Sequence, residues 1–154
     1  MRNPLSWQVE RNGNQVRFRF SGEITENSNF APLLRDGADE IVLDLAGIER
    51  INSCGVREWL NFVGLLAKGG HTLVMERCSV PIVHQLNMVS NFRGGAEVRS
   101  VYAPYLCGKC DQEGSKLIEL DKGGTVALKP ELCPSCGANM EFDDLPEAYF
   151  AFRN

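Results

Sequence analysis

Two pairs of cysteines form the clearest chemical pattern in the sequence. Cys107 and Cys110 make one CxxC motif, and Cys133 and Cys136 make a second one after residues 111–132. Two residues between cysteines let one tight turn direct both sulfurs at a single ion, so two such turns supply the four thiolates of a tetrahedral site. We therefore predict a Zn²⁺ site, although the spacing alone does not distinguish zinc from iron.

The predicted metal is structural. All four ligands come from the protein, which leaves no open coordination position for chemistry. Residues 115–120 and 125–128 are strand-like and flank Gly123 and Gly124, which predicts a hairpin and the architecture of a zinc ribbon. Gly137 is expected to adopt the conformation that lets backbone amides approach sulfur. Because about fifty residues with few core apolars fold poorly alone, metal binding should supply folding free energy.

Ser53 is the second candidate for chemistry because it lies at the predicted start of a helix. A serine there can cap free backbone amides, and a phosphate there would meet those amides and the positive end of the helix dipole. The residues leave two interpretations open. Either Ser53 or Asn52 is simply the N-cap, or Ser53 is a phosphorylated switch.

A strand and a helix must position Ser53. Residues 41–45 are all apolar except Asp44 and predict a buried strand, and residues 46–51 predict a turn. Asp44 is expected to accept hydrogen bonds from amides of that turn. The helix should run to Lys68 and end at Gly69, with one apolar stripe made of Val56, Trp59, Leu60, Val63, Leu66 and Ala67.

The remaining pattern predicts a mixed α/β sheet with helices packed on it. Residues 7–10 and 15–20 flank a turn and predict an antiparallel hairpin with one solvated face. Four further elements are expected in the rest of this region: a short helix within 25–35, a strand at 71–77, a helix beginning at 79–81 and a last strand at 97–102.

The composition changes near residue 104. We predict one domain over residues 1–104 and a second over 105–154, which is the small β zinc ribbon with a short C-terminal helix. Asp144 and Glu147 have the spacing of a capping box at the start of that helix. Its three aromatic residues should dock on the ribbon or the first domain, or else form a surface for a homodimer or another partner.

The motif around Ser53 resembles a known family. Residues 43–48 (LDLAGI) and 51–56 (INSCGV) are similar to the motif of STAS domains, the anti-sigma-factor-antagonist family, and the resemblance covers residues 6–102. It implies a compact α/β domain that binds other proteins and catalyses nothing. In family members a serine at this helix start is phosphorylated by a GHKL-type kinase that doubles as an anti-sigma factor, and the unphosphorylated form captures that kinase.

By this resemblance Ser53 is the phosphorylation candidate. The resemblance also implies that the chain is a phosphoprotein that acts in signal transduction and transcription regulation. The implied partner-binding residues are Asn52, Ser53, Cys54, Gly55 and Arg57. The family typically has aspartate where this chain has Asn52, and serine or threonine where it has Cys54.

Charge and hydropathy exclude several classes of protein. No apolar run approaches the ~18 residues that span a bilayer, and the start lacks an apolar signal core, so we expect a cytoplasmic protein with reduced thiols and no membrane partner.

The net charge is -4. Residues 1–105 hold 11 of the 16 Lys+Arg and 11 of the 20 Asp+Glu, which leaves 5 against 9 for the rest. This acidic excess argues against a nucleic-acid partner.

An enzyme is not expected, because the sequence shows no nucleophile–base pair and no open metal site. The alternative functions are a nucleic-acid-binding protein or a redox or metal sensor, each acting through the zinc ribbon. Cys54, at a helix start, is a conceivable redox residue. Cys78, His71 and His84 are interpreted as ordinary structural residues.

Overall fold

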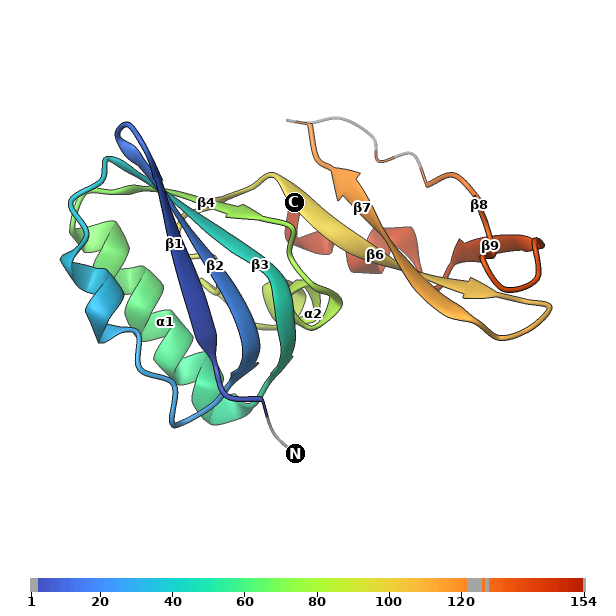
Figure 1. Ribbon diagram of the computed structural model, residues 1–154, viewed down its shortest axis with the longest axis horizontal. Helices are drawn as coiled ribbons and strands as arrows, with labels where there is room; N and C mark the ends of the chain where they lie inside the picture. The colour runs from blue at the N-terminus through green and yellow to red at the C-terminus, as the bar shows by residue number, and fades with distance from the viewer. Residues whose placement is uncertain (1–2, 122–125, 127, 154) are drawn as a thin grey trace.

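The N-terminal part of the chain forms one five-stranded sheet. The computed structural model describes residues 3–121, 126 and 128–153. The strands cross the sheet in sequence order and are β1 (Ser6–Asn12), β2 (Gln15–Ile24), β3 (Glu40–Ile51), β4 (Thr72–Glu76) and β5 (Glu97–Val98) (Figure 1). β1 and β2 are antiparallel, whereas β2 to β5 run parallel. The predicted mixed α/β class is confirmed.

The hairpin of β1 and β2 has one apolar face and one polar face. Along β2, the buried residues Val16 and Phe18 alternate with the part-exposed Arg17. Successive side chains of a strand point to opposite faces, so the apolar residues share one side and the arginines the other. The predicted hairpin with one solvated face is therefore present.

β3 is longer than the sequence predicts. Residues 41–45 are buried as expected, but residues 46–51, predicted as a turn, continue the strand to Ile51. They pair with the second half of β2 through register shifts that act as bulges. A Cβ on Gly47 would lie 2.7 Å from the carbonyl oxygen of Phe20, so this close pairing requires glycine. The prediction failed because the extension depends on a partner strand that is distant in sequence.

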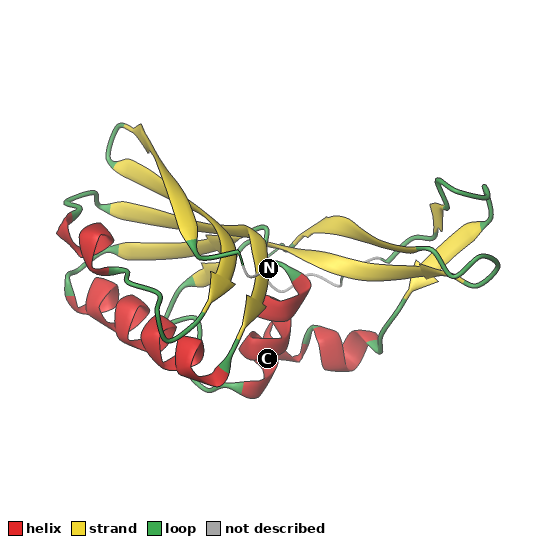
Figure 2. Cartoon of the chain, turned by 60° about the horizontal axis from the view of Figure 1, so that its bottom comes forward, coloured by secondary structure: helices red, strands yellow, loops and turns green. Residues whose placement is uncertain are grey.

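Two helices gather on one side of the first sheet (Figure 2). They are α1 (Ser53–Lys68) and α2 (Val80–Met88), and both begin where the sequence predicts. Trp59 and Phe62 of α1 pack edge to face on Phe20 of β2, with ring centroids 5.9 Å and 6.2 Å apart. This aromatic packing holds α1, and therefore its N-terminus, against β2. Within the predicted apolar stripe, Ala67 is the exception because it is exposed.

The segment before β3 departs from its predicted helix. Within residues 25–35 the structure contains only a 3-10 helix, η1 (Ala31–Arg35). The amide of Thr25 donates to Ser28 Oγ at 2.9 Å, and the amide of Asn27 donates to Thr25 Oγ1 at 3.2 Å. Such short polar side chains compete with helical backbone hydrogen bonds, so the chain turns here instead.

A second, antiparallel sheet extends away from the first (Figure 1). Its strands, in spatial order, are β7 (Glu113–Glu119), β6 (Ser100–Cys107), β9 (Asn139–Phe142) and β8 (Glu131–Leu132). The single strand predicted over 97–102 is divided: β5 completes the first sheet and β6 begins the second. β6 is continuous through residue 104, where we predict the domain boundary.

One arm of the hairpin predicted for the zinc ribbon pairs with a different strand from the one expected. β7 contains most of the predicted strand 115–120, but it pairs with β6 along its whole length. The other predicted arm, 125–128, and the glycine turn fall largely on residues 122–125 and 127, which lie outside the described residues.

The chain ends in α3 (Pro146–Tyr149) and the 3-10 helix η2 (Ala151–Arg153). As predicted, the aromatic residues dock on the rest of the protein: Tyr149 is 1%, Phe150 9% and Phe152 9% exposed. The predicted capping box is absent, because Leu145 is the N-cap and makes no side-chain capping bond. No helix within the described part of the chain is long and apolar enough to cross a membrane.

Candidate functional site

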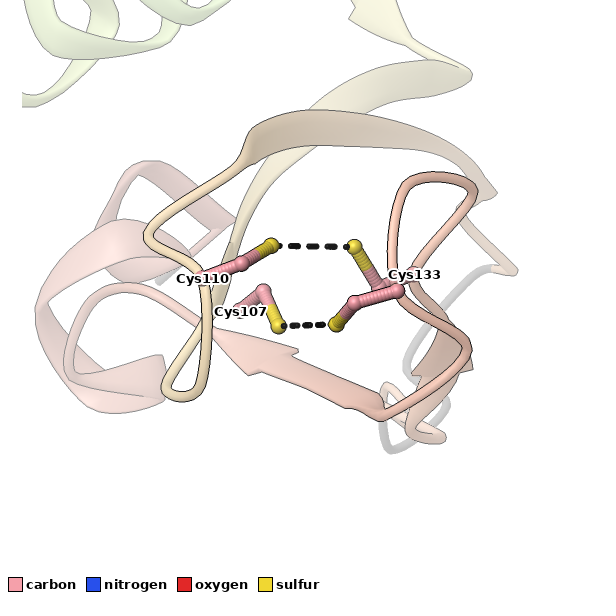
Figure 3. A group of neighbouring side chains, drawn as sticks. Cys107, Cys110 and Cys133 are labelled. Atoms are coloured by element: carbon pink, nitrogen blue, oxygen red, sulfur yellow. Dashed lines mark hydrogen bonds between the residues drawn. The ribbon is translucent and has the colours of Figure 1, made fainter.

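The four cysteines of the CxxC motifs meet in the second sheet (Figure 3). Cys107 and Cys110 belong to the turn from β6 to β7, and Cys133 and Cys136 to the turn from β8 to β9. The Sγ atoms of Cys107 and Cys136 are 3.5 Å apart, and those of Cys110 and Cys133 are 3.6 Å apart. All four Sγ atoms lie within 4.8 Å of one another.

The two cysteine turns have the same backbone design. The amide of Cys107 donates to Gln112 O at 2.9 Å, and the amide of Asp111 donates back to Cys107 O at 2.9 Å. In the second turn the amide of Cys133 donates to Ala138 O and that of Gly137 to Cys133 O. The residue after each CxxC pair has a positive φ, 60° at Asp111 and 75° at Gly137, as predicted for Gly137.

These turns direct backbone amides at sulfur. The amides of Cys110 and Lys109 lower the pKa of Cys107 to about 6. Burial raises the pKa of Cys133, but the amides of Cys136 and Ser135 outweigh burial, so that pKa is lowered too. Hydrogen bonds to a thiolate favour the charged form. The first cysteine of each pair is therefore prepared to be a thiolate ligand.

The second cysteine of each pair has the opposite shift. The amide of Gln112 lowers the pKa of Cys110, but the neighbouring sulfurs outweigh it and raise that pKa to about 12. Cys136 is also raised, despite the amide of Ala138. Four thiolates this close repel one another, and a cation among them removes the repulsion.

The dimensions of the cluster fit a metal ion. Four sulfurs at the corners of a tetrahedron are about 3.8 Å apart when the metal–sulfur bonds are about 2.3 Å. The two measured separations of 3.5 Å and 3.6 Å, and the limit of 4.8 Å for all pairs, agree with that size. The cluster can thus hold a metal such as zinc, with a protein ligand at every position. No other cluster of potential metal ligands occurs among the described residues.

The helix start at Ser53 is capped by its neighbour. Asn52 Oδ1 accepts the amide of Gly55 at 2.7 Å, and Asn52 Nδ2 donates to Glu26 Oε2 at 2.9 Å. Asn52, and not Ser53, is therefore the N-cap of α1. The Ser53 side chain is exposed and makes no hydrogen bond to any residue that the structure describes.

The other residues of this corner divide into exposed and buried ones. Asn52, Cys54 and Arg57 are exposed together with Ser53, whereas Gly55 is buried. A Cβ on Gly55 would lie 2.2 Å from the carbonyl oxygen of Ile24, at the end of β2. The backbone of α1 thus touches the backbone of β2 directly, and Gly55 serves this contact.

Asp44 is the centre of an ionic cluster that the sequence did not reveal. Its Oδ1 accepts the amide of Ala46 at 3.2 Å, in line with the expected turn contact. Its Oδ2 lies 3.4 Å from Arg17 and 3.2 Å from Arg77, and its side chain is only 3% exposed. Arg77 also donates to Tyr102 Oη at 3.0 Å and so links the two sheets. The alternation of apolar and polar residues in β2 indicated that Arg17 lies on the polar face of that strand. No local pattern indicated that Arg77 would lie beside Asp44.

The isolated histidines and cysteines have structural surroundings. His71 Nδ1 is 2.6 Å from the carbonyl oxygen of Ala38. The ring of His84 packs edge to face on that of Tyr149, with centroids 6.1 Å apart. Cys78 is fully buried, and burial raises the pKa of its thiol. Cys54 is exposed at the start of α1.

No protein-family model matches the chain, and no curated protein matches it.

Proposed function

We propose that the chain is a regulatory protein-binding module of the STAS type, similar in function to anti-sigma-factor antagonists and without catalytic activity. The observation that carries this proposal is the exposed Ser53 hydroxyl, which occupies the first position of α1 while Asn52 provides the cap. The order of hairpin, strand, helix, strand, helix and strand in the first sheet is the one that the resemblance implies, and it supports the same assignment.

Phosphorylation of Ser53 is the proposed switch. The first amides of a helix lack backbone acceptors, and only that of Gly55 is taken by Asn52, so the amides of Ser53 and Cys54 remain for a phosphate. A phosphate adds about −1.5 to −2 charge units. Glu26 already places a carboxylate beside Asn52. Phosphorylation would make the corner strongly anionic and change its affinity for a partner while the fold is retained.

The proposed partner is a GHKL-type serine kinase that also acts as an anti-sigma factor. The exposed side chains of Asn52, Ser53, Cys54 and Arg57 form the surface that such a partner would contact. Gly55 belongs to this surface only through its backbone position, because it is buried against β2. Capture of the kinase by the unphosphorylated form would release a sigma factor.

Two variants of Ser53 test the switch. The binding of Ser53→Ala and Ser53→Glu to a GHKL-type kinase encoded beside the gene of this chain is measured by calorimetry. Ser53→Ala should bind like the wild type, and Ser53→Glu should bind at least about tenfold more weakly. Ser90→Glu, at an exposed serine after α2, controls for added charge. Equal affinities of the two Ser53 variants contradict the switch.

A second test does not require a known partner. Protein purified from its native host is analysed for phosphopeptides by mass spectrometry, and a population of chains phosphorylated at Ser53 is expected. The absence of phosphate at Ser53 under every growth condition overturns the proposed modification.

The four cysteines are proposed to hold one structural Zn²⁺ per chain. A site closed by four thiolates contributes folding free energy and offers no position for a substrate. Elemental analysis should find one zinc per chain, and Cys136→Ser should lose both zinc and the fold of the second sheet. Cys54→Ser is the matched control, because Cys54 is an exposed cysteine outside the cluster. Iron in place of zinc, or metal-free folded protein, would contradict this assignment.

A further inference from the structure

The end of the chain returns from the second sheet to the first domain. After β9, residues 144–153 cross to α2 and lie along it, so that α3 and η2 both contact this helix (Figure 2). We call residues 144–153 the C-terminal segment. Its aromatic side chains are almost completely buried, with Tyr149 at 1% exposure. The second sheet is therefore joined to the first part of the chain twice: β6 connects it at its beginning in the sequence, and the C-terminal segment contacts α2 after its last strand.

One side chain of α2 holds the C-terminal segment by two hydrogen bonds. Asn87 Nδ2 donates to the carbonyl oxygen of Tyr149 at 2.9 Å, and Asn87 Oδ1 accepts the amide of Phe152 at 2.8 Å. Tyr149 Oη donates to the carbonyl oxygen of Tyr102 in β6 at 2.5 Å. An amide side chain with one donor and one acceptor satisfies both backbone groups at once.

The same segment packs on the strand that follows the second cysteine turn. The ring of Phe142 in β9 contacts the rings of Tyr149 and Phe150 edge to face, with centroids 5.5 Å and 6.1 Å apart. In β9, Met140 pairs with Cys107 on one side and Glu131 of β8 on the other. A continuous path of contacts thus joins Asn87 to the cysteines without passing through solvent.

The strands that carry the second cysteine pair are short. β8 has 2 residues and β9 has 4. Such short strands do not pair stably on their own, and a metal bound by both turns supplies the missing free energy. If the metal leaves, β9 keeps only its pairing with β6, in which Phe142 lies opposite Tyr105, and the packing of Phe142 on Tyr149 is weakened.

Resting on the metal site proposed above, we propose that metal binding at the four cysteines is thermodynamically coupled to docking of the C-terminal segment on α2. Loss of the metal releases the segment and breaks the contacts that Asn87 and His84 of α2 make with Tyr149. Coupling of binding free energies is reciprocal, so contacts made by Asn87 must also increase metal affinity. Asn87 is then a positioning residue for a metal centre to which it contributes no ligand.

The first test measures the effect of Asn87 on zinc affinity. Full-length wild type and Asn87→Ala are loaded with zinc and titrated with a chromophoric chelator. Loss of two hydrogen bonds should weaken zinc binding by about fivefold or more. Asn61→Ala is the matched control, because Asn61 is an exposed asparagine on α1, whereas the hydrogen bonds to Tyr149 and Phe152 come from Asn87 on α2. Unchanged zinc affinity in folded Asn87→Ala overturns the coupling.

The second test uses the unaltered chain, in case Asn87→Ala does not fold. Hydrogen exchange followed by mass spectrometry is compared for zinc-loaded and chelator-stripped protein, in peptides from α1 and from α2. Metal removal should accelerate exchange in α2 and in residues 144–153, while α1 keeps its protection. Unchanged exchange in α2 after complete removal of zinc overturns the proposal.

Discussion

The side-chain amide of Asn52 bridges the cap of α1 and the loop after β2, because its nitrogen donates to Glu26 Oε2 at 2.9 Å while its oxygen accepts the amide of Gly55 at 2.7 Å. A carboxylate at position 52 could perform only the second task, since it has no donor. Glu26 thus supplies a negative charge next to Ser53 that comes from a different segment of the chain.

Replacement of Asn52 by the residue typical of STAS domains should therefore be unfavourable here. Asn52→Asp keeps the cap acceptor but places a second carboxylate beside Glu26, and we expect a loss of about 1 kcal/mol in the free energy of unfolding. Glu26→Gln restores a donor and should recover most of this loss in the double variant. Urea denaturation of the four chains measures the coupling, and strictly additive effects would contradict the contact.

Glycines 55 and 64 of α1 should respond oppositely to alanine. A Cβ on Gly55 would meet the carbonyl oxygen of Ile24 at 2.2 Å, so Gly55→Ala should destabilise the fold by about 3 kcal/mol or more. A Cβ on Gly64 meets nothing within 4 Å, so Gly64→Ala should stabilise the helix by up to about 1 kcal/mol. Thermal denaturation distinguishes these outcomes. Similar effects at both positions would refute the close packing of α1 on β2.

Asp44 should be far more important for stability than Glu10, an acidic residue of β1 that also pairs with an arginine. It is 3% exposed and lies between Arg17 and Arg77, so Asp44→Ala leaves two guanidinium groups without this partner. We expect a loss of about 2–4 kcal/mol. Glu10→Ala removes a solvent-exposed pair with Arg19 and should cost at most about 0.5 kcal/mol. Chemical denaturation provides the comparison, and equal losses would contradict a central role of Asp44.

The ion pair of Asp36 with Arg11 should make the stability of the fold sensitive to acid. Burial tends to raise its pKa, but hydrogen bonds from Arg11 and from the amide of Ala38 outweigh burial and lower the pKa below its ordinary value of 3.8. A lowered folded-state pKa means that the ionised form stabilises the fold. This contribution is complete above pH 3.8 and is lost as the pH falls through the folded-state value.

The pKa of Asp36 can be measured by a carboxyl NMR titration of the full chain. Arg11→Ala should raise that pKa, because the remaining burial favours the neutral acid. Arg35→Ala, at an exposed arginine of η1, is the control and should leave the pKa unchanged. An unchanged pKa in Arg11→Ala would show that the ion pair is not the cause of the shift.

Local patterns were sufficient for the cysteine cluster, for the start of α1 and for the covered face of β2. Metal-ligand spacing is a property of two tight turns, and helical or strand periodicity is a property of consecutive residues. Each of these features is encoded within a few residues, such as Cys107 to Cys110, and therefore requires no knowledge of distant contacts.

Features that depend on a distant partner were not predictable in this way. β3 extends to Ile51 only because the second half of β2 lies beside it, and the side chain of Asn52 finds a second partner in Glu26, which lies 26 residues earlier in the chain. The chain passes from the first sheet to the second at Arg99, where the amide of Cys78 donates to Ser100 O at 3.1 Å and the amide of Tyr102 donates to Cys78 O at 2.8 Å. Asn87 holds the end of the chain across 62 and 65 residues. The contacts that stabilise these features join residues that are far apart in the sequence. Only the three-dimensional arrangement therefore specifies these features.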